Sequence, residues 1–235
     1  MAFVQKDFDP SIIHPYYFIR RSLLQKITKL SSHLTGKLMD FGCGSKPYKS
    51  LFKTTEYIGV DYENEGHSHE NEQIDVFYDG KTLPFESEYF DSVLCSEVIE
   101  HVFELKGTLK EINRVMKPGA HILITCPFVW NEHEVPYDFA RYTRFALEDI
   151  LEKSGFKMIH FEKSGNFITT ITQLKVLYYS NAFQKKWSAM FFTRWIYKFL
   201  FVLVPNVFGL LMEKIYPNDQ SLYLNNVLVA KKISS

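Results

Sequence analysis

The sequence predicts an α/β fold, in which a seven-stranded, mostly parallel sheet is covered by helices on both faces. Two observations lead to this prediction. Short apolar runs of strand length alternate with longer segments of helical spacing, and several runs end in an acidic residue or a glycine turn. With 235 residues, 46% of them hydrophobic, the chain is long enough for one sizeable core. We therefore expect a single domain over residues 1–235.

Charge and cysteine content narrow the function classes. Lys and Arg together number 27, as do Asp and Glu, so the chain lacks the excess positive charge typical of nucleic-acid binders, and no nucleic-acid partner is expected. The three cysteines, Cys43, Cys95 and Cys126, are far apart and form no CxxC pair, which argues against a disulfide framework or a structural zinc site. The first residues do not resemble a signal peptide. A cytoplasmic location is expected.

The order of elements follows from the hydrophobic pattern. Residues 1–35 are expected to form an N-terminal helical cap, because residues 16–30 carry apolar side chains at helical spacing. Further along, a KPG turn at 117–119 and a glycine at 155 are typical helix terminators. The strands are expected at residues 37–41, 57–60, 73–77, 90–95, 121–126, 156–161 and 222–231, and the helices at 46–53, 102–116 and 146–154.

An apolar helical insertion is expected at residues 165–217, before the last strand. Its centre, Trp195–Met212, is strongly apolar, but Pro205–Asn206 is expected to divide it into two pieces shorter than the roughly 20 residues of a membrane span. Three interpretations stay open. The helices cover a pocket or form a homo-oligomer interface, a hairpin contacts the membrane peripherally through residues 187–216, or one helix spans the bilayer.

The stretch LMDFGCGSKPY (Leu38–Tyr48) is the feature around which the pocket is expected to form. A strand ends there at Asp40, and Gly42 and Gly44 allow positive φ and close approach of a ligand. The second strand ends at Asp61, 21 positions further on, which suits hydrogen bonds to ribose hydroxyls. Both strand ends belong to the same edge of a parallel sheet. The sequence therefore predicts a nucleotide pocket there.

The kind of nucleotide is narrowed by a missing glycine. A dinucleotide fingerprint requires G-x-G-x-x-G, but Pro47 stands where the third glycine is needed. No Walker loop is present in the sequence. A dinucleotide or nucleoside triphosphate is thus disfavoured.

Taken together, the segments DFGCGS, YIGVD, DGKTLPFESEYFDSVLCSEVIEHV and LKEINRVMKPGAHILIT resemble the class I S-adenosylmethionine-dependent methyltransferases, in the branch called methyltransferase type 11. The resemblance covers roughly residues 36–126. It implies a Rossmann-like sheet and S-adenosyl-L-methionine as cofactor. The long insertion before the last strand departs from the family pattern and leaves the acceptor side open.

The resemblance also implies roles for the first matched residues. Asp40, with the backbone of Gly42 and Gly44, is expected to hold the methionine part of the cofactor. Asp61 is expected to bind both ribose hydroxyls, with Tyr62 beside the adenine.

The remaining matched residues lie further along the same edge. Asp79 is expected to contact the adenine amino group, with Gly80 adjacent to it. The strand end Cys95, Ser96 and Glu97 is expected to border the sulfonium.

Two histidines are candidates for the acceptor side of the reaction. Transfer to a hydroxyl requires a group that removes its proton, and histidine has a suitable pKa. His133 follows the fifth strand, where acceptor contacts are expected, and is the predicted catalytic base. His101, in EVIEHV, is expected to line the substrate pocket. His67 and His69 lie in an acidic segment without a further nearby ligand, so no metal site is predicted.

The loop around His133, HEVPYDFARYTRF, mixes charges with aromatic residues. Glu134, Tyr137, Asp138 and Arg141 would suit a polyhydroxylated substrate, and the alternative is an internally salt-bridged loop. The stretch resembles loops of methyltransferases associated with bacterial surface-polysaccharide biosynthesis.

These observations predict an S-adenosylmethionine-dependent methyltransferase that O-methylates a sugar, glycan or lipid-linked saccharide at the inner face of the membrane. A small apolar acceptor such as a quinone or lipid is the alternative. A non-catalytic cofactor-binding scaffold is a further alternative.

Overall fold

The computed structural model describes residues 8–62, 72–187 and 195–233. Among these, the chain divides into two compact units. The first comprises residues 26–162 and 226–233, and the second comprises residues 8–25 and 163–225. The expectation of a single domain over residues 1–235, with caps at 1–35 and 165–217, stays a prediction beside this division.

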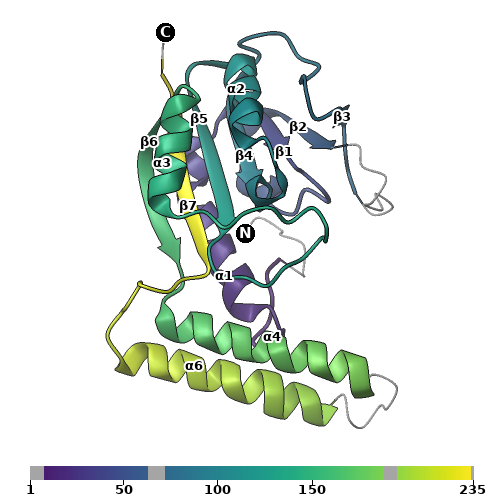
Figure 1. Ribbon diagram of the computed structural model, residues 1–235, viewed down its shortest axis with the longest axis vertical. Coiled ribbons are helices and arrows are strands. Elements are labelled where there is room, and N and C mark those ends of the chain that lie inside the picture. Colours follow the sequence, from purple (N-terminus) through teal and green to yellow (C-terminus); the bar gives the residue numbers. More distant parts are fainter. Residues whose placement is uncertain (1–7, 63–71, 188–194, 234–235) are drawn as a thin grey trace. The chain divides into compact units, whose positions relative to one another are not determined.

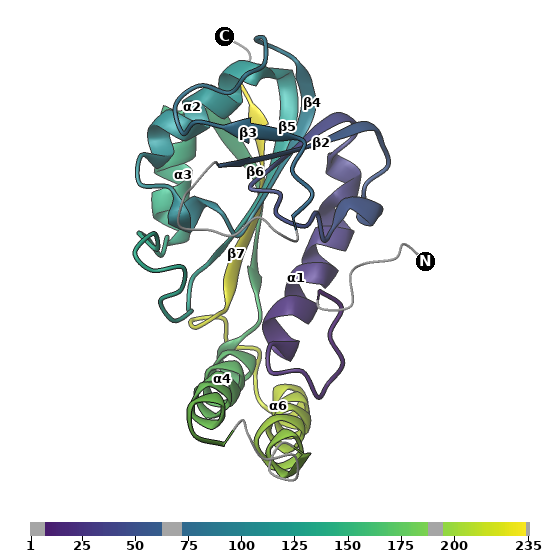
Figure 2. The same ribbon diagram turned by 90° about the vertical axis from the view of Figure 1, so that its right-hand side faces the viewer.

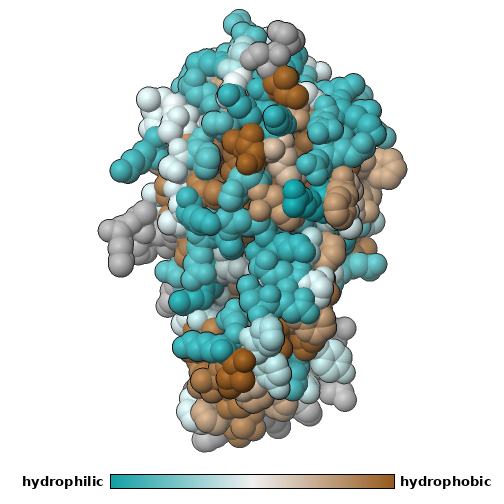
Figure 3. Space-filling view, turned by 90° about the vertical axis from the view of Figure 1, so that its left-hand side faces the viewer, coloured by the Kyte–Doolittle hydropathy of each residue, from teal (hydrophilic) through white to brown (hydrophobic). Residues whose placement is uncertain are grey.

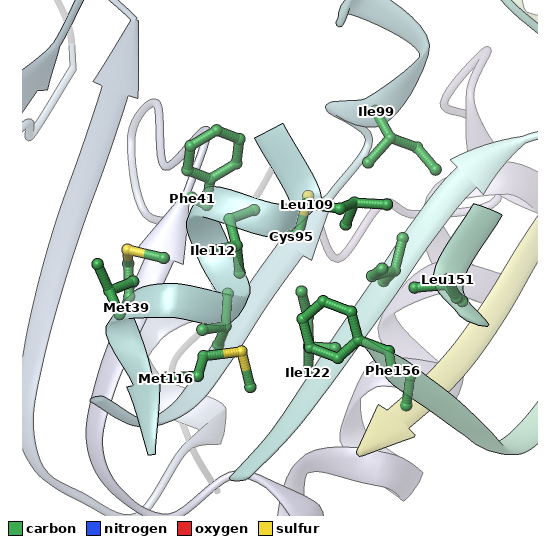
Figure 4. Close-up of a cluster of buried hydrophobic side chains, with 14 of the residues drawn as sticks. Met39, Phe41, Cys95, Ile99, Leu109, Ile112, Met116, Ile122, Leu151 and Phe156 are labelled. Atoms are coloured by element: carbon green, nitrogen blue, oxygen red, sulfur yellow. The ribbon is translucent and has the colours of Figure 1, made fainter. Parts of the chain in front are cut away.

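A seven-stranded, mostly parallel sheet confirms the predicted fold class. Its order is β3-β2-β1-β4-β5-β7-β6, and the pairs β3–β2, β2–β1, β1–β4 and β4–β5 are parallel. β7 runs opposite to β5 (Figure 4). The strands are β1 (Gly36–Phe41), β2 (Thr54–Tyr62), β3 (Val76–Tyr78), β4 (Phe90–Ser96), β5 (Met116–Pro127), β6 (Phe156–Ser164) and β7 (Asn225–Lys232).

Helices cover both faces of this sheet. α2 (Leu105–Val115) and α3 (Arg144–Lys153) lie on one face, and the end of α1 (Tyr17–Leu30), from Lys26 on, lies on the other (Figures 1 and 2). Leu38 and Met39, neighbours on the central strand β1, point to opposite faces and are both fully buried. Continuous apolar runs are what such a doubly covered sheet requires.

The core lies between the sheet and helices α2 and α3. Leu109 and Ile112 of α2 face Met116 and Ile122 of β5, and Phe156 of β6 closes the cluster (Figure 4). All five side chains are at most 2% exposed, so each removes nearly its whole apolar surface from water. Burial of this kind stabilises a fold by about 1.5–3 kcal/mol per large side chain.

The expected helix at residues 46–53 is wrong. Only a single 3-10 turn, η2 (Lys49–Leu51), forms there. Lys46 has a φ of +53°, in the left-handed region, and a right-handed helix cannot run through such a residue. Several boundaries also shift. β2 begins at Thr54 rather than 57, α2 at Leu105 rather than 102, and β7 at Asn225 rather than 222. β3 begins at Val76 rather than 73, and β5 begins at Met116, where α2 ends.

The insertion forms two helices that run side by side in the second unit (Figures 1 and 2). These are α4 (Phe167–Trp187) and a helical segment over Trp195–Ile215, which contains the π-helical turns η4 (Lys198–Leu203) and α6 (Val204–Ile215). The insertion begins and ends at neighbouring points, because the Leu224 amide donates to the Ser164 carbonyl over 2.8 Å.

The expectation that Pro205–Asn206 splits the apolar run is also wrong, because the second helix continues through them for 21 residues. Proline lacks an amide hydrogen and normally breaks the hydrogen-bond ladder of a helix. Here the preceding turns are π-helical, and the Val204 amide donates to the Phe199 carbonyl five residues back. The wider turn accommodates the proline ring without ending the helix.

Candidate active site

The glycine turn after β1 is shaped by two residues with positive φ. Gly42 has a φ of +73°, and a Cβ at this position would lie 2.2 Å from the side chain of Val98. Gly44 has a φ of +44°, and a Cβ there would meet only the Glu72 carboxylate, at 3.8 Å. The first glycine is required by packing. The second leaves open space, in which a ligand can approach the backbone.

Asp61, at the end of β2, is fixed against this turn. One of its carboxylate oxygens accepts a hydrogen bond from the Gly44 amide and the other from the Tyr62 amide, both over 2.8 Å. Because a carboxylate oxygen can accept more than one hydrogen bond, this carboxylate can also receive ribose hydroxyls. The structure thus brings Asp61 and the glycine turn together, as the sequence predicts.

Asp40 lies buried beneath the turn. The Tyr57 hydroxyl donates a hydrogen bond to its carboxylate over 2.6 Å. Burial nevertheless raises the pKa of Asp40 to about 7, because desolvation outweighs the hydrogen bond from Tyr57. A cationic ligand at this point would favour the ionised carboxylate. Asp40 therefore fits the amino and sulfonium charges of S-adenosylmethionine.

Three residues near Asp40 were missed by the sequence reasoning. Lys46 is buried and forms an ion pair with Asp75, whose carboxylate also accepts a hydrogen bond from the Gly59 amide over 2.6 Å. Tyr57 is the third. The sequence places Tyr57 in the second strand, but only the structure shows that it pairs in register with Leu38, two residues before Asp40.

The adenine side consists of Asp79, Gly80 and Tyr62. The Asp79 carboxylate accepts hydrogen bonds from the amides of Lys81 and Thr82 over 2.8 and 2.9 Å, which lower its pKa and fix the turn. A Cβ at Gly80 would lie 2.8 Å from the ring of Tyr62, so this glycine makes room for the ring. Tyr62 is 48% exposed and can stack on a base.

The three residues at the end of β4, Cys95, Ser96 and Glu97, differ in whether their side chains can reach a cofactor. The side chain of Cys95 lies in the hydrophobic core (Figure 4), so a cofactor contact there would have to use its backbone. The Ser96 hydroxyl donates to the Thr125 hydroxyl over 2.9 Å, and Thr125 in turn donates to the Glu97 carboxylate over 2.8 Å. Ser96 and Glu97 are thereby positioned from β5.

His101 and His133 meet on the acceptor side. Their Nε2 atoms are 3.2 Å apart. His101 Nδ1 lies 2.8 Å from the Tyr137 carbonyl, and His133 Nδ1 lies 3.2 Å from the Asp138 carboxylate. Because the Tyr137 carbonyl can only accept, His101 Nδ1 is the donor there, and His101 Nε2 is left as an acceptor that faces His133 Nε2. The pair is therefore suited to hold a proton or a cation between the rings.

Glu100 is buried next to this pair. Neither of its carboxylate oxygens has a hydrogen-bond partner, and burial together with the nearby Glu97 raises its pKa well above the usual range. Among the described residues, the donor atoms of Glu100, His101 and His133 lie within 4.8 Å of one another, close enough to hold a metal ion. His67 and His69 lie outside the described residues. Glu100 was not among the predicted site residues, although its position next to His101 in EVIEHV could have indicated it.

Asp138 and Arg141 bind each other rather than solvent. Their side chains form two hydrogen bonds, over 2.5 and 2.7 Å, and Arg141 lowers the pKa of Asp138 to about 2. Arg141 also donates to the Asn131 carbonyl over 3.1 Å. This is the internally salt-bridged loop of the alternative interpretation, and it holds His133 in place. Glu134 and Tyr137 remain exposed toward the acceptor side.

Aromatic side chains next to the histidines form an exposed group that the sequence analysis did not identify. Phe103 is 76% exposed and Phe139 is 43% exposed, and their ring centroids are 5.3 Å apart. The ring of Tyr137 lies 6.5 Å from Phe139. The Phe139 amide donates to the Glu100 carbonyl over 2.8 Å, which ties this aromatic group to the histidine pair.

A mostly parallel sheet with a glycine turn after β1, a buried aspartate at the end of β1 and a second aspartate at the end of β2 fits the class of S-adenosylmethionine-dependent methyltransferases. Comparison with known families agrees with this assignment. A family of methyltransferase domains matches residues 16–161, which is more than half of the chain. The chain belongs to this family. It is an enzyme, and S-adenosylmethionine is its methyl donor.

Curated relatives match parts of the chain. A demethylmenaquinone methyltransferase of Staphylococcus saprophyticus is 34% identical over 100 residues, which span 37% of this chain and 42% of the relative. The mitochondrial ubiquinone biosynthesis O-methyltransferase of Homo sapiens is 31% identical over 130 residues, or 46% of this chain and 34% of the relative. The matches thus span less than half the length of these relatives.

Solved structures agree in fold. The [4+2]-cyclase SpnF has a TM-score of 0.59 at 17% identity, and the comparison covers 100% of this chain and 88% of SpnF. The phosphoethanolamine N-methyltransferase 2 of Haemonchus contortus in complex with S-adenosyl-L-methionine has a TM-score of 0.51 at 18% identity, covering 99% and 61%. At these identities the likeness concerns the fold alone.

Proposed function

We propose that the enzyme methylates a hydroxyl group of a small, lipid-borne acceptor, with His133 as the base. The observation that carries this proposal is the histidine pair, held by Asp138 and the Tyr137 carbonyl, beside an exposed aromatic group. A base and an apolar binding surface then lie on the same side of the first unit.

The residues of this side have separate tasks in the reaction. S-adenosylmethionine, when bound, supplies an electrophilic methyl group. Asp138 accepts a hydrogen bond from the His133 backbone amide over 3.1 Å, and its carboxylate lies 3.2 Å from Nδ1, where it stabilises the protonated ring after Nε2 has removed the acceptor's hydroxyl proton. His101 Nε2, at 3.2 Å, shares this proton. The aromatic side chains exclude water and place the oxygen for in-line attack.

An acceptor with an aromatic ring and an apolar tail, of the quinol class, fits this surface best. Phe103 and Phe139 offer ring faces, and two relatives are a demethylmenaquinone methyltransferase and a ubiquinone biosynthesis O-methyltransferase. A lipid-linked saccharide of surface-polysaccharide biosynthesis is the second candidate. Sugar rings also stack on aromatic side chains, and the exposed Glu134 and Tyr137 can bind hydroxyls.

Replacement of His133 tests the proposed base. We expect His133→Ala to lower kcat about 10²-fold or more, because the hydroxyl proton loses its acceptor, while the affinity for S-adenosylmethionine is unchanged. His160→Ala removes a similarly exposed histidine of β6 and is the control. Steady-state kinetics and calorimetry give the two readouts. Normal turnover of His133→Ala would exclude this histidine as the base.

The acceptor can be identified with isotope-labelled cofactor. The protein is incubated with S-adenosylmethionine labelled in its methyl group and with either lipid extracts or water-soluble glycans, and the products are analysed by mass spectrometry. We expect label in a lipid-soluble phenol ether. Label in a lipid-linked sugar would favour the saccharide, and label in no fraction, without S-adenosylhomocysteine, would favour a cofactor-binding scaffold.

We place this reaction in the cytoplasm, at the inner face of the membrane. Three free cysteines, Cys43, Cys95 and Cys126, are buried as thiols, which suits a reducing compartment. A lipid-borne acceptor would be reached at the bilayer surface. Fractionation of cells into soluble and membrane parts tests this placement.

A further inference from the structure

One face of the second helix of the insertion is a row of exposed apolar side chains. They recur every three or four residues, and we call them the apolar face: Trp195, Ile196, Phe199, Leu200, Val204, Val207, Phe208, Leu211 and Ile215. In Figure 3, apolar residues gather over the region of α4 and α6. A single soluble chain rarely exposes a continuous apolar surface of this length.

The opposite face of the same helix is packed inside the second unit. Val202 and Asn206 are at most 1% exposed, and the Asn206 amide group donates to the carbonyls of Ile12 over 2.7 Å and His14 over 3.4 Å. The rings of Tyr197 and Phe183 of α4 stack at 4.1 Å.

This attachment argues against a transmembrane position. The segment is 21 residues long with a mean hydropathy of 1.7, long and apolar enough to cross a bilayer. However, Asn206 at its midpoint is bound to a polar N-terminal segment, which would have to enter the hydrocarbon with it. A helix with one attached and one exposed apolar face is suited to lie in the plane of the membrane surface.

The charges of the two helices of the insertion indicate which kind of membrane surface they would bind. On α4 and on the helical segment over Trp195–Ile215, Lys175, Lys198 and Lys214 are exposed, although the whole chain has no net charge. Glu213 is the single acidic residue of these segments, and its carboxylate accepts a hydrogen bond from the Asn166 amide group over 3.2 Å. The balance is complementary to anionic lipid headgroups.

We propose that this helical hairpin is an interfacial anchor for anionic membranes, with the apolar face immersed in the headgroup region and the lysines at the level of the phosphates. The inference deepens the proposed function by naming its membrane partner and the mode of contact. It requires no catalytic step, since it depends on residues of the second unit alone.

Flotation of the full chain with vesicles tests the anchor. We expect the protein to float with vesicles of phosphatidylcholine containing about one third phosphatidylglycerol, and to bind neutral phosphatidylcholine vesicles at least tenfold more weakly. Phe208→Ser with Leu211→Ser should abolish flotation. Phe145→Ser with Ile159→Ser removes two comparably exposed apolar side chains of the first unit and should float like the unchanged protein.

Charge variants and alkaline extraction separate the modes of contact. Lys198→Gln with Lys214→Gln should weaken binding to anionic vesicles roughly tenfold or more, since each lysine near such a surface strengthens binding by about 1 kcal/mol. Bound protein should be released by alkaline carbonate. Resistance to extraction would indicate a spanning helix and overturn the interfacial mode.

A second copy of the chain is the competing occupant. If light scattering shows a dimer that Phe208→Ser with Leu211→Ser converts to a monomer, and the unchanged protein does not float, the apolar face is a subunit interface and the proposal is wrong. Turnover of a water-soluble acceptor by the same variants should be unchanged. If the unchanged protein turns over the acceptor but does not float, the anchor proposal fails and the reaction stands. If it floats but turns over no acceptor, the proposed reaction fails and the anchor stands.

Discussion

At the scale of single residues, the three carboxylates that are expected to bind the cofactor lie in different environments. Asp40 is buried and titrates near neutral pH, Asp61 is fixed by two backbone amides, and Asp79 closes an exposed turn. The same side-chain type can therefore meet a cation, a pair of hydroxyls and an amino group. Burial and hydrogen-bond partners, and not the residue type alone, determine the charge and the free acceptor positions of each carboxylate.

Removal of the Asp61 carboxylate should weaken cofactor binding. We expect Asp61→Ala to raise the Kd for S-adenosylmethionine at least tenfold, because both ribose hydroxyls lose a charged acceptor and the Gly44 amide loses its partner. Calorimetry measures the change. Asp149→Ala, which removes an exposed carboxylate of α3, is the control. An unchanged Kd for Asp61→Ala would exclude the ribose assignment.

The pKa of Asp40 predicts a pH dependence of cofactor affinity. With a pKa of about 7, the ionised fraction rises from about one tenth at pH 6 to about nine tenths at pH 8. The Kd for the cationic cofactor should therefore fall nearly tenfold over this range. Protein stability should change with pH in the opposite direction. Because the pKa of Asp40 is higher in the folded state than in the unfolded state, this group favours folding most at low pH, and the free energy of unfolding falls as the pH rises toward 7.

Calorimetry in buffers from pH 6 to 8 measures this dependence. Asp40→Asn should bind the cofactor more weakly, with a nearly flat profile. A profile of Asp40→Asn that keeps the slope of the unchanged protein would assign the titration to another group.

At the scale of elements, the loop between β5 and α3 holds His133 in place. Asp138 and Arg141 pair with each other in the second half of the loop, and the Arg141 side chain also donates to the Asn131 carbonyl nearer its start. These side-chain hydrogen bonds restrict the conformation of the loop, as backbone hydrogen bonds do for the strands of a sheet. The proposed base is therefore held by a loop that is linked through side-chain hydrogen bonds.

Arg141→Gln should loosen this loop. We expect the pKa of Asp138 to rise from about 2, the free energy of unfolding to fall by about 1–3 kcal/mol and kcat to fall about tenfold, with unchanged cofactor affinity. Thermal unfolding and kinetics measure the effects. Lys153→Gln breaks the exposed pair with Asp149 and should cost less than about 1 kcal/mol. Equal effects of the two variants would contradict the special role of Arg141.

The elements also show what the sequence could predict. Strands and amphipathic helices were identified because buried faces impose a pattern of hydrophobic residues, and Asp40 and Asp61 because they end such strands. The helix expected at 46–53 failed because nothing in the residue type announces the left-handed Lys46. The contact between His101 and His133 depends on loop conformation across 32 residues, which periodicity does not encode.

At the scale of the whole molecule, the two units divide the work. Residues 26–162 and 226–233 contain every predicted site residue, and residues 8–25 and 163–225 contain the hairpin with its apolar face. The predicted site residues and the proposed anchor thus lie in separate parts of the chain. This separation allows each to be tested by substitutions that leave the other intact.

The neighbouring ends of the insertion have a consequence for how this chain can vary. A single hydrogen bond between Leu224 and Ser164 marks where the polypeptide leaves the edge of the sheet and where it returns. Since β6 and β7 are adjacent strands, everything between these residues can be lengthened, shortened or exchanged without a change in strand order. The insertion can therefore change while the sheet that carries the predicted site residues keeps its order.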